Sequence, residues 1–198
     1  MKITPTTANR GGLVTVSGSG YAAKETVNIA LSGTTGTAAT ARADARGVLP
    51  PTGITIPYSL KPGAHTVTAT GAPSKRSASA AVTVQQLSPS ISLSSALVSP
   101  GASVTVTGTG FGRTEQVTLA LNGAALPTAP HLTTSTNGAF TATFTVPSSL
   151  LDGANTVSAI GNQSRVSAVT PLTGHLPVAA QFYFAGAVST ARYIGLRT

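Results

Sequence analysis

The sequence predicts an all-β protein made of two tandem seven-stranded β-sandwiches followed by a short tail, and three observations support this. One pattern occurs twice, because residues 11–21 (GGLVTVSGSGY) return about ninety residues later as residues 101–111 (GASVTVTGTGF). Charged residues make up 8% of the chain, against about 25% in an ordinary soluble domain, which disfavours long amphipathic helices. Short apolar segments alternate residue by residue with threonine, as in strands with one wet face.

The repeat sets the expected domain boundaries. The offset of about ninety residues is still present at Val67 and Val157. Solenoid and propeller repeats have shorter periods of about 20–50 residues, so each copy is expected to be a complete small domain. We therefore predict one sandwich in residues 1–86 and a second in residues 87–172.

The segments outside the repeat predict a stiff junction and an incomplete tail. The boundary at residues 86–90 is short and contains one proline, which favours a stiff connection over a flexible tether. Residues 173–198 lose the repeat and contain Phe182, Tyr183 and Phe184. We expect them to be a tail or the start of a further, truncated module.

Strand faces follow from the period-two pattern. In the second copy Val104 and Val106 alternate with Thr105 and Thr107, which predicts valines facing inward and threonines facing outward. The same rule places apolar residues of both copies in the cores: Val14, Val16, Val27, Ile29, Leu31, Ile54, Ile56, Val67, Ala69, Ala80, Val82, Val84, Val117, Leu119, Leu121, Phe140, Ala142, Phe144 and Val146. His65 is expected on the inward face of its strand.

Glycine and proline positions predict the turns. Residues 44–47 (DARG) and 135–138 (STNG) each join two strands, and Asn-Gly is a strong hairpin signal. Pro57 and Pro147 end strands because proline cannot donate to a ladder. The copies diverge at residues 50–51 (PP), where we expect an interrupted strand with a bulge in the first copy.

The net charge of +8 reflects a shortage of acids more than a basic patch. The acids number four, and the twelve Lys and Arg residues are scattered, with the densest cluster at Lys75 and Arg76. A nucleic-acid binder concentrates its cations in a stripe with interleaved aromatics, so no specific nucleic-acid binding is expected. Weak attraction to anionic cell-wall polymers remains open beside a plainly soluble basic surface.

Compartment signals are few. Cysteine is absent, so the cores must rely on packing alone. The first residues contain no apolar stretch typical of a signal peptide, and nowhere does the sequence approach eighteen consecutive apolar residues, so no transmembrane segment is expected. Because the repeat begins almost at the first residue, we expect the chain to be a monomeric fragment of a longer protein.

The repeated segments resemble bacterial immunoglobulin-like domains of the IPT/TIG type. The resemblance is carried by residues 99–111 (SPGASVTVTGTGF), 134–147 (TSTNGAFTATFTVP) and 153–159 (GANTVSA), and the two copies together cover residues 3–172. It implies immunoglobulin-like sandwiches that recur as extracellular modules of large bacterial surface or secreted proteins. In such proteins the modules are spacers, stalks or adhesive segments.

Histidines and acids are the candidate site residues, and their pattern argues against a metal or a catalytic centre. His65, His131 and His175 show no His-x-x-x-His spacing, and Asn155 replaces His65 in the second copy. A hydrogen-bonding structural role is therefore expected for His65. Four acids spread over two domains are too few for a calcium cage. We predict no catalytic residues, no metal ligands and no cofactor.

Glu25 and Glu115 occupy equivalent positions just before a strand. A paired functional acid is one interpretation. We favour the other, a turn residue bonded to a backbone amide or a nearby cation. Residues 18–20 (GSG) resemble a phosphate loop superficially, but no Lys-Ser or Lys-Thr follows, so they are expected to be a turn.

Aromatic residues give little support to a sugar platform. Tryptophan is absent, and Tyr21 is matched by Phe111, which indicates packing. Tyr58 is the candidate exposed ring, but a single ring makes a weak platform. Asn162 begins a sequence that fits the N-glycosylation sequon, which we attribute to chance.

The sequence as a whole favours a non-catalytic structural, spacer or adhesive segment of a larger bacterial cell-surface or secreted protein. The copies share glycines, prolines, turns and inward-facing apolar residues, whereas His65, Tyr58 and the pair Lys75 and Arg76 are not shared. The alternative is a module that binds cell-wall or extracellular polysaccharide, or a surface protein. We expect an extracellular or cell-surface location.

Overall fold

The computed structural model describes residues 1–127 and 132–176, and every regular element in these residues is a β-strand. The first half contains β1 (Lys2–Thr4), β2 (Thr7–Asn9), β3 (Leu13–Ser19), β4 (Thr26–Leu31), β5 (Ala39–Arg42), β6 (Val48–Thr55), β7 (Gly63–Gly71) and β8 (Ser77–Gln85). The second half contains β9 (Ser90–Leu93), β10 (Leu97–Val98), β11 (Ser103–Thr109), β12 (Val117–Leu121), β13 (Ala124–Ala125), β14 (Phe140–Thr145), β15 (Gly153–Gly161) and β16 (Ser167–Gly174).

The strands form two sandwiches of the same topology. In the first, the sheet β1-β3-β6 faces the sheet β2-β8-β7-β4-β5; in the second, β9-β11-β14 faces β10-β16-β15-β12-β13. The short pairs β1/β2 and β9/β10 are one edge strand divided between the two sheets, with β2 and β10 running parallel to β8 and β16. Each unit is thus a seven-stranded immunoglobulin-like sandwich, which confirms the predicted fold class.

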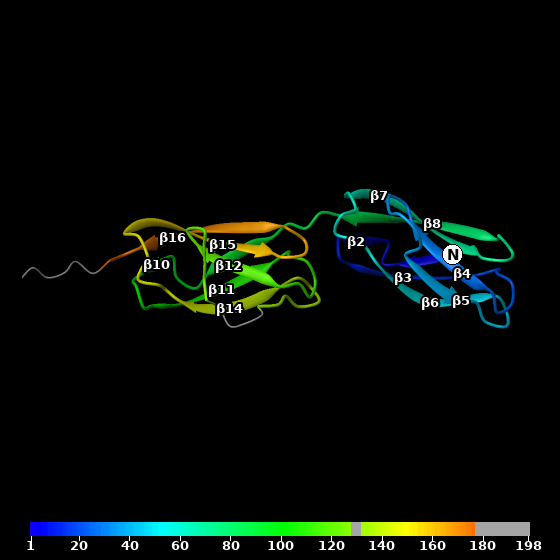
Figure 1. Ribbon diagram of the computed structural model, residues 1–198, viewed down its shortest axis with the longest axis horizontal. Helices are drawn as coiled ribbons and strands as arrows, with labels where there is room; N and C mark the ends of the chain where they lie inside the picture. Colours follow the sequence, from blue (N-terminus) through cyan, green and yellow to red (C-terminus); the bar gives the residue numbers. More distant parts are fainter. Residues whose placement is uncertain (128–131, 177–198) are drawn as a thin grey trace, which may run out of the picture.

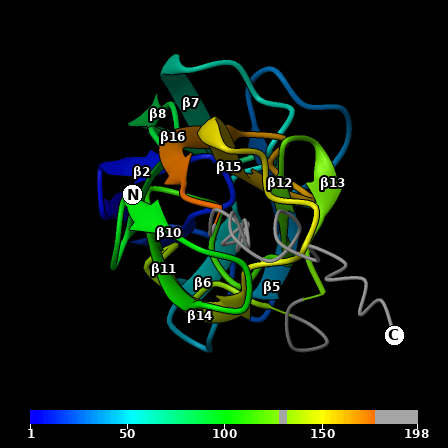
Figure 2. The ribbon, with the colours of Figure 1, turned by 90° about the vertical axis from the view of Figure 1, so that its left-hand side faces the viewer.

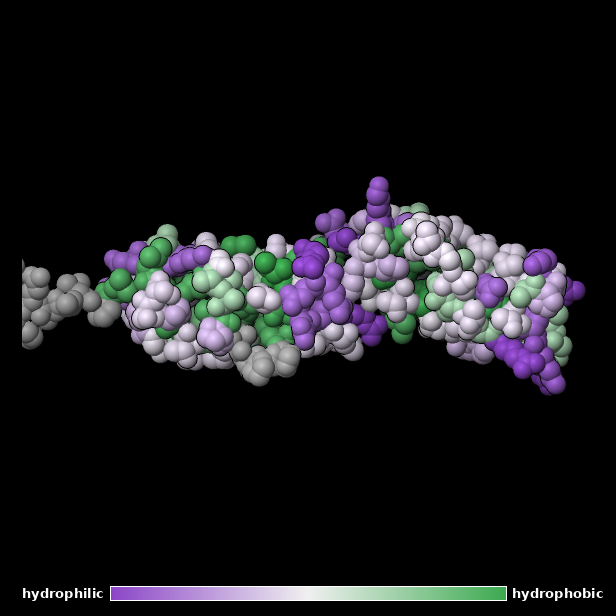
Figure 3. Space-filling model, in the orientation of Figure 1, coloured by the Kyte–Doolittle hydropathy of each residue, from purple (hydrophilic) through white to green (hydrophobic). Residues whose placement is uncertain are grey.

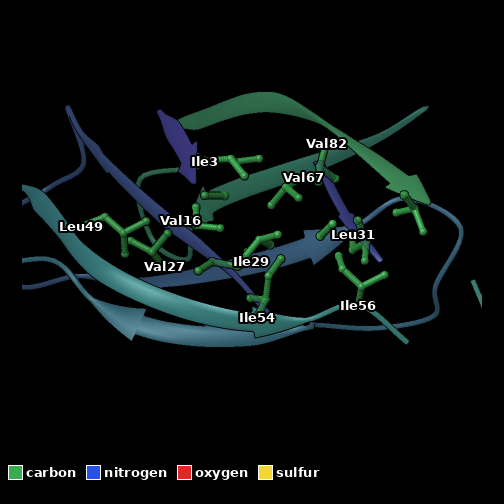
Figure 4. Close-up of a cluster of buried hydrophobic side chains, with 14 of the residues drawn as sticks. Ile3, Val16, Val27, Ile29, Leu31, Leu49, Ile54, Ile56, Val67 and Val82 are labelled. Carbon is green, nitrogen blue, oxygen red and sulfur yellow. The ribbon is translucent and has the colours of Figure 1, made fainter. Parts of the chain in front are cut away.

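Each sandwich encloses its own apolar core. Figure 4 shows the first core, in which side chains from both sheets point toward one another; Val16, Ile29 and Ile56 are fully buried. In the second core Val104, Val106 and Leu119 are buried in the same way. The period-two pattern therefore assigned the inward faces correctly, with Ala80 and Ala142 half-buried at the core margins.

The strand containing residues 50–51 differs in part from the expectation. The bulge is present, because β6 uses three steps from Leu49 to Thr52 where β3 uses two from Gly18 to Val16. The strand is not interrupted, since β6 runs from Val48 to Thr55. Prolines fit here because β6 is an edge strand, and its outer side has no ladder to complete.

The two predicted turns connect opposite sheets instead of forming hairpins. Residues 44–47 join β5 to β6, and residues 135–138 lie before β14, so each chain segment crosses from the five-stranded to the three-stranded sheet. Gly47 and Gly138 have φ of 75° and 72°. A Cβ at Gly47 would overlap the carbonyl group of Tyr21, and one at Gly138 would overlap that of Phe111. These turns need glycine because they pack against the backbone just after β3 and β11.

The sandwiches lie end to end along the longest axis of the molecule (Figure 1). Figure 2, viewed along that axis, shows one sandwich in front of the other. The chain enters the first sandwich at β1 and leaves the second after β16, at the opposite end of the molecule. The last strand extends to Gly174, two residues past the end of the sequence repeat, and the expectation for the tail falls mainly on residues 177–198, outside the described residues.

We expect Val106→Asp and Phe144→Asp each to unfold the second sandwich. Both side chains are buried, and an unpaired carboxylate there costs several kcal/mol, comparable with the stability of a small domain. Thr105→Lys is the control: Thr105 points outward and loses one hydroxyl contact with Thr143, worth about 1 kcal/mol or less. Urea unfolding followed by circular dichroism measures the three variants. Equal tolerance of all three would show that the inward face is assigned wrongly.

Candidate functional site

Tyr58 connects the two sandwiches. It follows β6 in a turn in which the Leu60 N–H donates to the Pro57 carbonyl. Its ring lies against Gly11, where a Cβ would overlap it, and its hydroxyl lies against Gly112 and donates to the Arg113 carbonyl at 3.4 Å. Tyr58 is half-buried, so it is a contact between sandwiches and not the exposed sugar platform considered from the sequence.

The linker packs against both sandwiches. Leu87 is 4% exposed, and just before the linker the Arg10 N–H holds the end of β8 by donating to the Gln85 carbonyl at 3.2 Å. Gly110 approaches Ser88 so closely that a Cβ would overlap the Ser88 carbonyl. A linker with a buried Leu87 and a close contact between Ser88 and Gly110 agrees with the stiff junction expected from its composition.

A groove of about 400 Å³ opens at this junction. The first sandwich contributes Arg10 and Leu13, the linker Leu87, and the second sandwich Phe111 and Arg113. A second hollow of about 320 Å³ shares Leu13 and Arg113 with the groove and includes Tyr58. Figure 3 shows hydrophilic surface where the sandwiches meet and again at the outer end of the first sandwich, with hydrophobic areas on the second.

The two arginines at the groove are incompletely satisfied. Arg10 donates from Nη1 to the Tyr58 carbonyl at 3.2 Å, but its Nε is buried without a hydrogen-bond partner in the described chain. The half-buried Arg113 side chain makes no hydrogen bond or ion pair within residues 1–127 and 132–176. Arg113 therefore keeps its guanidinium donors available to a ligand, and Arg10 keeps Nη2, whereas its buried Nε is out of a ligand's reach.

Glu115 holds the loop that carries Arg113. Its carboxylate is fully buried and accepts hydrogen bonds from the Gly112 N–H (2.5 Å), the Gln163 N–H (3.1 Å), and the N–H and hydroxyl of Ser164 (2.8 and 2.7 Å). Four donors compensate the burial of its charge. The favoured interpretation, a turn residue bound to backbone amides, agrees with this geometry.

Glu25 has the same arrangement in the first sandwich. It is 6% exposed and accepts from the Ala22 N–H (2.5 Å), the Ser74 hydroxyl (2.9 Å) and the Ser74 N–H (3.2 Å). Burial acts to raise the pKa of Glu25, but these hydrogen bonds, with help from the Arg76 charge, outweigh it, so the pKa lies below the ordinary value. The carboxylate is consequently held in its ionised form.

Burial raises the pKa of the Tyr58 hydroxyl, and the nearby Glu115 charge adds to this effect while Arg113 opposes it. The hydroxyl therefore stays protonated and can donate to the Arg113 carbonyl. Tyr21, the equivalent of Phe111, is buried and donates to the Ala69 carbonyl at 3.2 Å, as its predicted packing role requires.

His65 is a structural residue. Nδ1 lies 3.0 Å from the Ser32 carbonyl and Nε2 lies 2.8 Å from the Lys61 carbonyl. Asn155 does the same work in the second sandwich, donating from Nδ2 to the Leu151 carbonyl at 2.8 Å and accepting from Asn122 at 2.7 Å. His65 is half-buried at the end of the inward face, and the two side chains tie equivalent loops by different chemistry.

The remaining candidates do not converge on a site. His175 is exposed, and its N–H donates to the Val98 carbonyl at 2.8 Å; His131 lies outside the described residues. Among the described residues, no group of three or more His, Asp or Glu side chains could hold a metal ion. Residues 18–20 end β3 and lead into a turn, and Asn162 accepts from the Thr118 hydroxyl at 3.0 Å.

Sequence reasoning missed the junction because its residues differ between the two copies. Tyr58 corresponds to Ser148, Arg10 to Pro100, and Arg113 to Ala23. The one available signal was that these positions differ between the copies while neighbours such as Gly11 and Pro57 are repeated. Membrane crossing by a helix is not indicated, because the described residues contain no helix long and apolar enough for it.

No protein-family model and no curated protein matches the chain. Among solved structures it is similar to SGBP-B of the Bacteroides ovatus mixed-linkage glucan utilization locus, in complex with a mixed-linkage heptasaccharide (20% identity, 86% of this chain and 43% of that one, TM-score 0.33). It is also similar to the Yersinia pseudotuberculosis adhesin InvE (15%, 87% and 57%, TM-score 0.37) and to a chimeric titin Z1Z2 tandem (15%, 87% and 94%, TM-score 0.33). This chain thus spans less than half of the first of these proteins. Similarity at this level assigns no ligand to the chain.

We expect Glu115→Gln to destabilise the second sandwich by about 2–4 kcal/mol, because the new amide cannot accept all four hydrogen bonds and buries an NH₂ against donors. Asp152→Asn is the control, since Asp152 is exposed and its carboxylate accepts one bond, from the Leu176 N–H. Its effect should stay within about 0.5 kcal/mol in urea unfolding. Similar losses for both variants would contradict the structural role of Glu115.

The stability of the first sandwich should fall in acid. Because the pKa of Glu25 is lower in the folded state, its contribution is complete above the usual glutamate pKa of about 4.3 and is lost as the pH falls through the lower folded value. Urea unfolding measured from about pH 6 down to about pH 3 should show this decline. Glu25→Gln should be less stable at neutral pH and show a flatter pH profile; an unchanged profile would refute the assignment.

Proposed function

We propose that the chain is a non-catalytic spacer segment of a larger bacterial cell-surface or secreted protein, with rigid units at residues 1–86 and 87–172. The observation that carries this proposal is the end-to-end arrangement with a packed junction, in which Tyr58 and Leu87 join the sandwiches. A rod formed this way separates its two ends by the length of both domains. The IPT/TIG-like sequence pattern supports an extracellular location.

The internal chemistry of each sandwich also fits a load-bearing role. The buried Glu25 and Glu115 carboxylates tie loops to the strands, and the unlike residues His65 and Asn155 tie equivalent loops. These four polar side chains, which might have formed a reactive site, instead hold the loops of each sandwich in place. The polysaccharide-binding alternative rests on the junction groove and is developed in the next subsection.

Small-angle scattering of the full chain should give a radius of gyration well above the roughly 16 Å of a compact globule of this length. The chain has no cysteine, so Arg46→Cys with Ser149→Cys places spin labels at the outer ends of the two sandwiches. We expect a narrow distance distribution that broadens in Tyr58→Ala, which removes the ring from Gly11 and Gly112. Tyr58→Phe, which keeps the ring and loses the long 3.4 Å hydrogen bond, should broaden it much less.

Two outcomes would refute the spacer. One is a compact scattering profile with the sandwiches folded side by side. The other is a distance distribution that is already broad in the parent chain and unchanged by Tyr58→Ala.

A further inference from the structure

The two arginines of the junction groove occupy positions at which the other copy of the repeat has an uncharged residue. Arg113 replaces the Ala23 of the first copy, and Arg10 replaces the Pro100 of the second. Each sandwich thus carries its extra arginine on the end that faces the other. Each sandwich forms without a cation at the equivalent position of the other copy. Arg10 has a local role, because it donates to the Tyr58 carbonyl, but the Arg113 side chain has none within the described residues.

Neither arginine is neutralised. The Arg113 side chain has no partner within the described residues, and Arg10 makes one side-chain hydrogen bond there, to the Tyr58 carbonyl, and no ion pair. Glu25 and Glu115 are buried in their own hydrogen-bond networks, and the exposed acids Asp44 and Asp152 do not line the groove. The groove is therefore positive, and half-buried guanidinium groups with free donors favour oxyanions.

The rest of the lining suits a sugar. Asn9, Thr136 and Asn137 are exposed at the groove, and their side chains make no hydrogen bond within the described chain, which leaves amide and hydroxyl groups for sugar hydroxyls. Leu13, 47% exposed, offers an apolar surface for the C–H face of a ring. These features complement a chain of hydroxylated rings.

Nucleic acid fits less well. Single strands bind by stacking bases on exposed aromatic rings. Phe111 is 2% exposed, and the Tyr58 ring is half-buried against Gly11, so neither is the exposed ring that base stacking uses. We propose that the junction groove binds an acidic polysaccharide, with Arg10 and Arg113 pairing with its carboxylates. This binding site goes beyond the spacer role and does not depend on it.

Affinity electrophoresis of the full chain in polygalacturonate, with dextran as the neutral polymer and oligo-dT as the phosphate polymer, tests the proposal. Arg113→Gln should weaken retention by polygalacturonate about tenfold, the loss expected for one charge-assisted contact. Arg46→Gln is the matched control, since it removes the same charge from an exposed turn at the outer end of the first sandwich, and it should change retention less than about twofold.

The thermal unfolding midpoint should be unchanged in Arg113→Gln, because the side chain makes no hydrogen bond to lose. Equal losses in Arg113→Gln and Arg46→Gln would overturn the site and indicate diffuse charge. No retention by polygalacturonate, or retention by oligo-dT that is as strong and equally sensitive to Arg113→Gln, would overturn the ligand class. Scattering measures the spacer separately, so either proposal can fail alone.

Discussion

The arrangement of the molecule depends on one buried carboxylate, that of Glu115. It draws the Gly112 N–H and the Ser164 N–H and hydroxyl toward a single point, and so fixes a loop and a turn that are far apart in sequence. Thr134 reinforces the loop by donating to the Gly112 carbonyl at 2.6 Å and accepting from the Glu115 N–H at 2.9 Å. Because Tyr58 contacts this same loop, the geometry of the junction follows from the internal order of the second sandwich.

The fold was predictable because the residues that build it are repeated. Alternating positions such as Val104 and Val106 report a strand with one buried face, and this signal is local. The Asn-Gly pair in residues 135–138 predicts that the chain reverses its direction. It does not predict which sheet the next strand joins, so the crossing from one sheet to the other could not be foreseen. The structural role of Glu115 was partly indicated by Glu25 at the equivalent position of the first copy. Its burial could not be predicted, because it depends on hydrogen-bond donors that are distant in the sequence.

The residues of the junction could not be predicted from the sequence for a different reason. Tyr58, Arg10 and Arg113 are brought together by the packing of one complete domain on another, and no spacing along the chain encodes that contact. Their lack of counterparts in the other copy made them look like surface variation. His65 and Asn155 show that unmatched residues can also serve matched structural tasks, so the difference between copies alone does not separate the two cases.

The bulge at residues 50–51 has a consequence for how the chain assembles. Neighbouring domains of similar sequence can exchange strands during folding and become trapped. The strand β6 needs seven residues, Leu49–Thr55, to span the six of Leu13–Gly18, whereas β14 spans Ser103–Gly108 residue for residue. A strand in the wrong sandwich would arrive one residue too long or too short for the turns at its ends. The extra residue of β6 therefore disfavours an exchange of β6 and β14 between the sandwiches. We expect it to favour pairing of each strand within its own sandwich when both copies emerge from the ribosome in succession.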